Sequence, residues 1–272
     1  GRLLGYLFVI ASIGVLGYLI GQLTSLINSV REQREYGLRG TSFTDHVIII
    51  GWNRFAQSIT DNLMHTSSRI AVVTDNRDDL TVVRNTYPAR RVFALFSDYQ
   101  NFTLIRRANI DKASMVFINL QDDAAKLVYF VNCKRRFPSH IPYTVIPDNA
   151  ELISTFRNAG VDHVLSRDTI AAKVIASYVY EPDVAAYAED LVTASSEKSQ
   201  FDIQQFQILP ENPYKNKSYQ QALDDMYKRF NAVLIGVSRF EENQWVIHKN
   251  PGDKSMILQV NDYLIVITDG KT

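Results

Sequence analysis

Residues 46–58, HVIIIGWNRFAQS, decide the fold of this 272-residue chain. A short apolar run typical of a buried strand leads to Gly51, and a helical pattern follows from Arg54. The spacing of Gly51, Asn53 and Ala56 is a variant of the G-x-G-x-x-G/A turn that joins strand to helix in dinucleotide-binding sheets. The glycine permits a tight turn, the alanine permits close packing, and the asparagine tolerates unusual backbone angles. The N–H groups at the start of the new helix favour a phosphate.

A second apolar run, Arg69 to Val73, leads to Asp75, which lies 24 residues after Gly51. A carboxylate at this position is placed to bind ribose hydroxyls. The alternative is an α/β turn without a ligand, in which Asp75 caps the next helix. Because strand, turn, helix, strand and acid occur in this order, the sequence predicts a nucleotide site. The charge of Asp75 disfavours NADP, an effect that Arg77 would partly offset.

The strand pattern of the N-terminal half repeats about every 20–27 residues. Repeated strand–helix units give a parallel, doubly wound sheet, whose ligands lie beyond the carboxyl ends of the strands. The apolar runs begin near His46, Arg69, Arg91, Ser114, Pro142 and Asp162.

Polar residues at the strand ends are therefore the predicted ligand contacts, although loops are polar even without a ligand. We expect Asp98 to reach the base or the second ribose. Arg54 would pair with an outer phosphate, or else be a solvated surface arginine. The predicted ligand is NAD(H) or ADP/ATP. The predicted cofactor-binding residues are Gly51, Trp52, Asn53, Arg54, Phe55, Ala56, Asp75, Asn76, Arg77, Ser97, Asp98 and Asn119.

The composition excludes several classes of protein. The chain has 29 basic and 29 acidic residues, so a nucleic-acid partner is not expected. Cys133 is the single cysteine, which rules out an intrachain disulfide and fits a reducing cytosol. The five histidines form no recognisable catalytic pairing, and H-E-x-x-H, G-x-S-x-G and P-loop motifs are absent from the sequence. The sequence favours a sensor over an enzyme.

An uncharged run of 25 residues, residues 3–27, opens the chain. As a helix it would be about 37 Å long, enough to cross a bilayer with some tilt. Arg31, Arg34 and Arg39 follow the run, so residues from about 31 onward are expected in the cytoplasm.

Glycines recur within this helix and could allow close helix packing or a bend. Gly14 and Gly17 lie near one face, but a plain membrane anchor would also contain glycines. These 272 residues supply no selectivity filter, pore loop or outer helix, so the helix looks like the last span of a longer membrane protein.

The second half of the chain contains two segments whose patterns differ from the repeated strand–helix units. Residues 168–196 predict two helices broken at Pro182, placed where subunits could pair. Their acidic residues could bind calcium, but a solvated acidic face fits better because no D-x-D loop is present. These residues are Glu181, Asp183, Glu189 and Asp190. Residues 200–270 predict a small α+β module with strand-like runs at Ile203–Leu209, Ala232–Val237, Gln244–His248 and Tyr263–Thr268 and a helix at Tyr219–Phe230.

These stretches together resemble the RCK family, the regulators of potassium conductance, also called TrkA or KTN domains. The resemblance covers about residues 45–270, and the order of its motifs is more specific than any single motif. It rests on HVIIIGWNRFAQS, VVTD at 72–75, FSD at 96–98 and AGVDHVLSRDTIAAKVIA at 159–176, followed by NAVLIGVSR at 231–239 and NDYLIVI at 261–267. The first helix resembles the pore-lining inner helix of a two-span potassium channel, and EQREYGLRG resembles the short linker of calcium-gated prokaryotic channels.

The resemblance implies a ligand-sensing gating domain that couples a nucleotide to the opening of a potassium channel. It implies a homotetramer in the cell membrane, in contact with lipid, whose RCK domains pair into a gating ring. K⁺ would permeate a pore outside this sequence, with Gly14 or Gly17 as the gating hinge. The implied domains are a transmembrane helix (1–30), a linker (31–44), TrkA-N (45–167), crossover and dimerisation helices (168–199) and TrkA-C (200–272).

The sequence departs from the family at two positions of the predicted site. Ser97-Asp98 replaces the usual Gly-Asp, and Asn53 replaces the second glycine. The identity of the nucleotide therefore stays open, and no calcium ligand can be matched residue by residue. Two other functions remain as alternatives: the RCK tail of a potassium transporter or potassium–proton antiporter, and a membrane-tethered NAD-dependent oxidoreductase.

Overall fold

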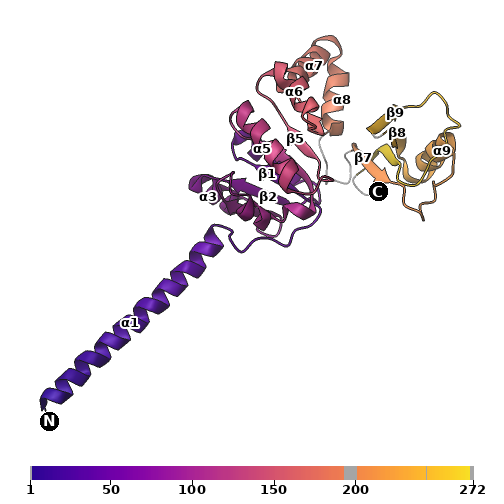
Figure 1. The fold of residues 1–272 in the computed structure, drawn as a ribbon. Coiled ribbons are helices and arrows are strands. Elements are labelled where there is room, and N and C mark those ends of the chain that lie inside the picture. Colours follow the sequence, from indigo (N-terminus) through magenta and orange to yellow (C-terminus); the bar gives the residue numbers. More distant parts are fainter. Residues whose placement is uncertain (1, 193–200, 243, 270–272) are drawn as a thin grey trace. The chain divides into compact units, whose positions relative to one another are not determined.

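The structure is a computed structural model that describes residues 2–192, 201–242 and 244–269 (Figure 1). The chain divides into two units, Gly1–Thr60 with Ser68–Asp168 and Asp61–Ser67 with Thr169–Thr272. Each unit has its own hydrophobic core.

Helix α1 (Arg2–Glu35) contains the whole uncharged run of residues 3–27, so the predicted helix is confirmed. Among the residues that the structure describes, no helix has both the length and the apolar character of a membrane span.

The first unit contains six parallel strands in the order β3-β2-β1-β4-β5-β6, which confirms the predicted doubly wound sheet. The order reverses direction between β1 and β4, and ligands of such sheets bind at this switch point. All five residues of β2, IAVVT, are buried, as expected of a strand covered on both faces. The strands are β1 (His46–Ile50), β2 (Ile70–Thr74), β3 (Val92–Phe96), β4 (Ala113–Ile118), β5 (Tyr143–Val145) and β6 (His163–Val164).

Helices connect these strands, and several of them begin just beyond strand ends. His46, predicted to be structural, is buried at the start of β1 with its Nε2 2.8 Å from the Ala108 carbonyl oxygen. The helices are α2 (Arg54–Leu63), α3 (Arg77–Thr86), α4 (Phe102–Ile105), α5 (Asp123–Arg136) and α6 (Ile153–Asn158), with 3₁₀ turns η1 (Arg106–Ala108), η2 (Ile110–Lys112) and η3 (Ala150–Leu152).

The segment after α1 lies against the edge strand β3. Gly37 and Gly40 have φ angles of +72° and +79°, and this left-handed backbone cannot continue helix α1, which ends at Glu35. A Cβ at Gly37 would lie 2.3 Å from the Ala94 carbonyl oxygen, so only glycine fits this approach. The Phe96 N–H donates to the Tyr36 carbonyl at 3.0 Å. The linker is therefore bonded to the sheet directly after the helix.

The second unit confirms the predicted α+β module. Four antiparallel strands run in the order β7-β10-β8-β9. Ser218 and Gln221 form a capping box at the start of the helix that packs on them, and Asn231 ends that helix in the left-handed conformation. The elements are α7 (Arg167–Tyr180), α8 (Pro182–Val192), β7 (Phe201–Gln207), α9 (Tyr219–Phe230), β8 (Val233–Glu241), β9 (Gln244–Lys249) and β10 (Tyr263–Asp269).

Candidate functional site

The turn at the end of β1 has the predicted tight geometry. Gly51 has a φ of +92°, and a Cβ there would lie 2.4 Å from the Asn119 carbonyl oxygen. The Asn119 N–H donates to the Ile50 carbonyl at 2.8 Å, so the ends of β1 and β4 are bonded together. Any residue with a side chain at 51 would push these two strand ends apart.

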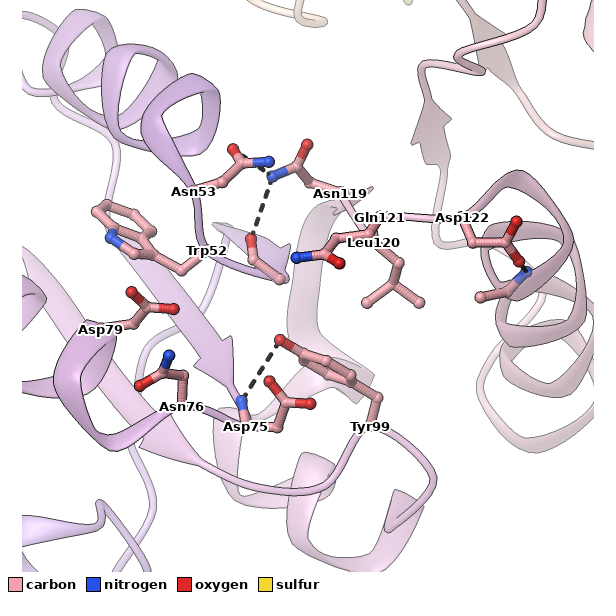
Figure 2. Close-up of a pocket in the computed structure, with 12 residues that line it drawn as sticks. Trp52, Asn53, Asp75, Asn76, Asp79, Tyr99, Asn119, Leu120, Gln121 and Asp122 are labelled. Carbon is pink, nitrogen blue, oxygen red and sulfur yellow. Dashed lines mark hydrogen bonds between the residues drawn. The ribbon is translucent and has the colours of Figure 1, made fainter.

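A pocket of about 340 Å³ lies beyond these strand ends (Figure 2). Its volume falls in the range of about 300–1,000 Å³ that is usual for small-molecule sites. It is lined by Gly51, Trp52, Asn53, Asp75, Asn76, Asp79, Tyr99, Asn119, Leu120, Gln121, Asp122 and Ala125.

The structure brings together about half of the residues that the sequence proposes as ligand contacts. Asp98 lines an adjoining hollow of about 500 Å³. The residues that line the first pocket are Gly51, Trp52, Asn53, Asp75, Asn76 and Asn119, whereas Arg54, Phe55, Ala56, Arg77 and Ser97 line neither of these two hollows.

Local contacts explain where these five residues lie. The Arg77 guanidinium stacks over the rings of Tyr36 and Phe96, at 5.1 and 5.6 Å from their centroids. Ser97 is buried, and its hydroxyl donates to the Asp98 carbonyl at 2.9 Å. The remaining three are the first residues of α2. Of these, Ala56 is fully buried, as expected of the small residue that lets helix and sheet approach.

The lining residues absent from the predicted set are Asp79, Tyr99, Leu120, Gln121, Asp122 and Ala125. Their common signal is position, because most of them follow directly on a predicted strand end. Asp79 lies in the first turn of α3, just after the end of β2.

The adjoining hollow shares Asp75, Tyr99, Leu120 and Ala125 with the first pocket. The Tyr99 hydroxyl lies between the two and accepts a long hydrogen bond from the Asp75 N–H at 3.4 Å. Burial raises the pKa of the Tyr99 phenol, which therefore stays neutral. The hollow also contains Arg136, whose guanidinium lies 4.8 Å from the centroid of the Phe102 ring.

The first pocket is acidic. Three carboxylates line it, those of Asp75, Asp79 and Asp122, and the described lining includes no lysine, arginine or histidine. Burial raises the pKa of Asp79, and the nearby charges of Asp75 and Asp78 add to the shift, while a hydrogen bond from Thr74 opposes it. The field in the pocket therefore disfavours anions.

Asn53 is the N-cap of α2. Its Oδ1 accepts the N–H groups of Phe55 and Ala56, both at 3.0 Å, and the side-chain amide of Asn119 donates to the same atom at 2.9 Å. The φ of Asn53 is not positive. Asn53 therefore does not adopt the left-handed conformation that asparagine tolerates, and capping explains this residue instead.

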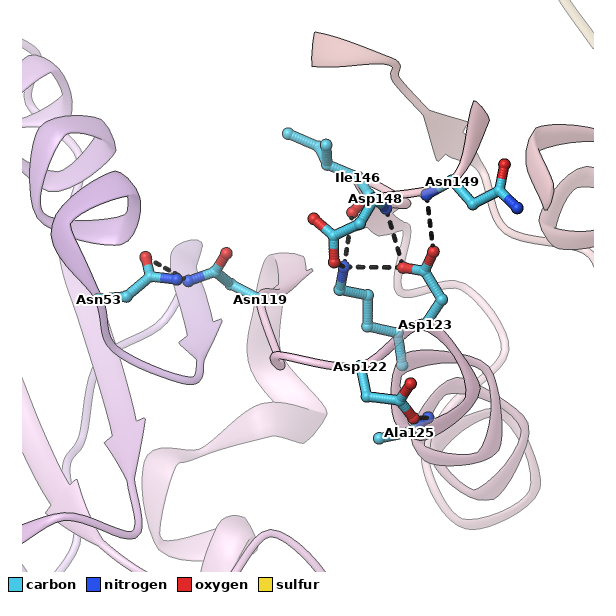
Figure 3. Close-up of polar contacts among 9 residues, drawn as sticks. Asn53, Asn119, Asp122, Asp123, Ala125, Ile146, Asp148 and Asn149 are labelled. Carbon is cyan, nitrogen blue, oxygen red and sulfur yellow. Dashed lines mark hydrogen bonds and ion pairs between the residues drawn. The ribbon is translucent and has the colours of Figure 1, made fainter. Parts of the chain in front are cut away.

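Two other helices that begin at the pocket are capped in the same way. The Asp78 N–H donates to Asn76 Oδ1 at 2.8 Å. The Ala125 N–H donates to Asp122 Oδ2 at 2.8 Å, a bond that Figure 3 shows. The residue that caps α3 is thus Asn76, and the alternative role of Asp75 as the cap is wrong.

A buried lysine fixes the start of α5 (Figure 3). The Lys126 ammonium, 2% exposed, contacts Asp123 Oδ1 at 2.8 Å, Asp148 Oδ2 at 2.6 Å and the Ile146 carbonyl at 3.0 Å. Asp123 also accepts the N–H groups of Asp148 and Asn149, both at 2.9 Å. Burial alone would raise the pKa of Asp123, but these hydrogen bonds outweigh it and hold the pKa below its usual value.

The geometry does not support a calcium site. In the ranges that the structure describes, no three histidine, cysteine, aspartate or glutamate side chains are grouped to hold a metal ion. In the acidic region of α7 and α8, the Tyr178 hydroxyl donates to Glu189 at 2.5 Å.

Comparison with known proteins identifies the first unit. Residues 47–167 match the TrkA-N domain family, which confirms the resemblance over this N-terminal part. Potassium channel protein 1 of Methanocaldococcus jannaschii is 18% identical over 202 residues, which are 72% of this chain and 60% of that protein.

Among solved structures, the human SLO3 gating ring has the same fold. It matches with a TM-score of 0.68 and 14% identity over 86% of this chain and 49% of that chain. The GsuK RCK domain matches with a TM-score of 0.43 and 18% identity over 85% of this chain and 46% of that chain, too low a score to support an inference. The chain thus spans about half of the SLO3 chain.

Replacing Asn53 tests its role as a cap. We expect Asn53→Ala to lower the free energy of unfolding by about 1–2 kcal/mol, because two helix N–H groups and the Asn119 amide lose their acceptor. Asn53→Ser keeps an oxygen acceptor and should stay within about 0.5 kcal/mol of the wild type. Urea unfolding of both variants measures the difference, and equal stabilities would contradict the capping role.

Replacing Asp123 tests the Lys126 network. Its lowered pKa means that the stabilisation is complete above the unfolded-state pKa and is lost as pH falls through the folded-state pKa. We expect Asp123→Asn to cost about 3 kcal/mol at pH 7 and almost nothing in strong acid. The control Asp148→Asn should cost less than about 1 kcal/mol, because that side chain is 53% exposed. Denaturant unfolding between pH 7 and pH 3 measures both, and a loss independent of pH would refute this account.

Proposed function

Starting from the TrkA-N domain at residues 47–167, we propose that this chain is the ligand-sensing part of a potassium channel, joined to its gate helix. The proposal rests on a continuous series of contacts that joins the pocket, through β2 and β3, to the linker after α1. A pocket at the switch point of the sheet contacts the end of β2 through Asp75. Strand β2 pairs with β3, and the end of β3 is bonded to the linker that follows α1.

The proposed ligand is a nucleotide of the NAD(H) or ADP/ATP type. The Asp75 carboxylate at the end of β2 is placed for ribose hydroxyls, as in other sheets of this kind. Arg77 stacks on Tyr36 and Phe96 and does not line the pocket, so it is not placed to bind a 2′-phosphate, and the charge of Asp75 disfavours NADP. Asp98 in the adjoining hollow is the proposed contact for a second ribose or a base.

We assign α1 to the membrane on its sequence, since 25 consecutive residues carry no charge and basic residues follow them. This places residues from about 31 onward in the cytoplasm and α1 in contact with lipid. Gly14 and Gly17 are the proposed hinge, and a Cβ at either position would meet no atom within 4 Å in the isolated chain. K⁺ is the proposed permeant ion.

Ligand binding would bias the gate only through unequal affinity for the open and closed states. A coupling of about 1–3 kcal/mol per site is typical of such systems. In the proposed homotetramer, several sites act on one gating ring and their couplings add.

Helices α7 and α8 are the proposed pairing surface between RCK domains. Val179, Tyr180 and Val192 are 82%, 83% and 79% exposed, an unusual exposure for large apolar side chains on adjacent helices. Ile170, Val174 and Ala185 line a mostly apolar groove of about 460 Å³ between the same helices. A second copy of this surface would cover these residues by two-fold pairing.

Replacing Asp75 tests the nucleotide sensor. We expect the whole chain in detergent to bind at least one of NAD, NADH, ADP and ATP saturably. Asp75→Asn should weaken that binding by about tenfold or more, because hydrogen bonds from ribose hydroxyls to a charged acceptor are lost. Isothermal titration calorimetry measures this, with Asp78→Asn, an exposed neighbour outside the pocket lining, as the control. A folded protein that binds none of the four would refute the proposed sensor.

Replacing Val179 tests the pairing surface. We expect Val179→Arg to shift the chain to smaller assemblies, because the new charge would be buried in an apolar contact. Mass photometry of the detergent-solubilised chain measures the change. Tyr227→Arg on α9, where the native side chain is 61% exposed, is the control and should leave the assembly unchanged. Equal masses for Val179→Arg and the wild type would exclude this surface.

A further inference from the structure

The starts of three helices line the pocket, and at each of them a side chain of the protein caps the helix by accepting one or two of its N–H groups. In nucleotide-binding sheets, free N–H groups at such helix starts hold phosphate. Here Asn53, Asn76 and Asp122 accept hydrogen bonds from the first turns of α2, α3 and α5. All three caps are themselves pocket-lining residues.

Asn53 caps α2, the helix whose start binds phosphate in nucleotide-binding sheets of this kind. A phosphate at the start of α2 would compete with Asn53 Oδ1 for the N–H groups of Phe55 and Ala56. The Asn119 amide, which is only 6% exposed, would then lose the same acceptor. Displacing one side chain therefore breaks three hydrogen bonds, two of which the phosphate could replace.

Charge acts in the same direction as the caps. The carboxylates of Asp75, Asp79 and Asp122 line the pocket, and no cationic side chain among its described lining balances them. The negative field of these carboxylates would repel a phosphate group, whereas a hydroxyl group can donate hydrogen bonds to the carboxylates.

The groups that remain suit a nucleoside. The half-buried Trp52 packs edge-on against Tyr87, with ring centroids 6.2 Å apart, and the Tyr99 ring lies across the pocket (Figure 2). The rings of Trp52 and Tyr99 offer apolar surface to a base. The amides of Asn119 and Gln121 offer hydrogen-bonding groups, and the Asp75 carboxylate offers an acceptor for a ribose diol.

We infer that the pocket recognises the nucleoside part of its ligand and rejects phosphate, with Asn53 as the residue that determines this specificity. The inference rests on the proposed function, because it concerns the ligand of the same pocket. Affinity falls in the order adenosine, AMP, ADP, ATP. Among the proposed nucleotides, NAD(H), which carries two nucleosides and no terminal phosphate, binds better than ATP.

Calorimetric titration of the whole chain in detergent with adenosine, AMP, ADP, ATP and NAD at constant ionic strength tests this order. Each added phosphate is expected to weaken binding several-fold. Asn53→Gly, a substitution that helix starts tolerate well, exposes two N–H groups and should improve ADP binding by about tenfold relative to adenosine. The matched control is Asn101→Gly, which removes the cap of α4, a side chain outside both linings, and leaves the order unchanged.

Two outcomes overturn the inference and leave the proposed function intact. One is ADP or ATP binding to the wild type at least as tightly as adenosine. If Arg136→Gln abolishes that preference, the phosphates lie in the adjoining hollow. The other is an unchanged ratio of ADP to adenosine affinity in Asn53→Gly. Binding of none of these compounds to the folded chain overturns both the inference and the proposed function.

Discussion

The close approach of Gly51 to the Asn119 carbonyl is the constraint on which the site depends. The ends of β1 and β4 are bonded at this point, where the strand order of the sheet reverses. With no Cβ at 51, the chain turns over the end of β4 and enters α2 at once, which places Asn53 within reach of the Asn119 amide. This backbone contact thus holds two strand ends together at the pocket and places the Asn53 cap beside them.

The sequence predicted the architecture well because it depends on patterns that are local or periodic. All six parallel strands and the C-terminal α+β module lie where alternating apolar and polar segments indicate. The pattern also placed Gly51, Asp75 and Asn119 at strand ends, and all three line the pocket.

Side-chain direction was harder to predict, because partners distant in sequence decide it. Arg77 follows Asp75 closely, yet Tyr36 from the linker and Phe96 from β3 hold its guanidinium by stacking. Asn53 occupies a position where the motif usually has glycine, and its capping role depends on Asn119, 66 residues later. The Lys126 network joins α5 to a loop more than 20 residues away, and periodicity carries no signal for such a contact.

The linker has a consequence for the sheet itself, because β3 is its outermost strand. Edge strands present unpaired backbone groups that can recruit strands from other molecules. Here Tyr36 and Gly37 cover part of that edge, through the bond to Phe96 and the close approach to Ala94. A fragment beginning at residue 45 would keep every strand of the TrkA-N domain but uncover this edge. Self-association of such a fragment would then reflect the missing cover, not the native assembly of the chain.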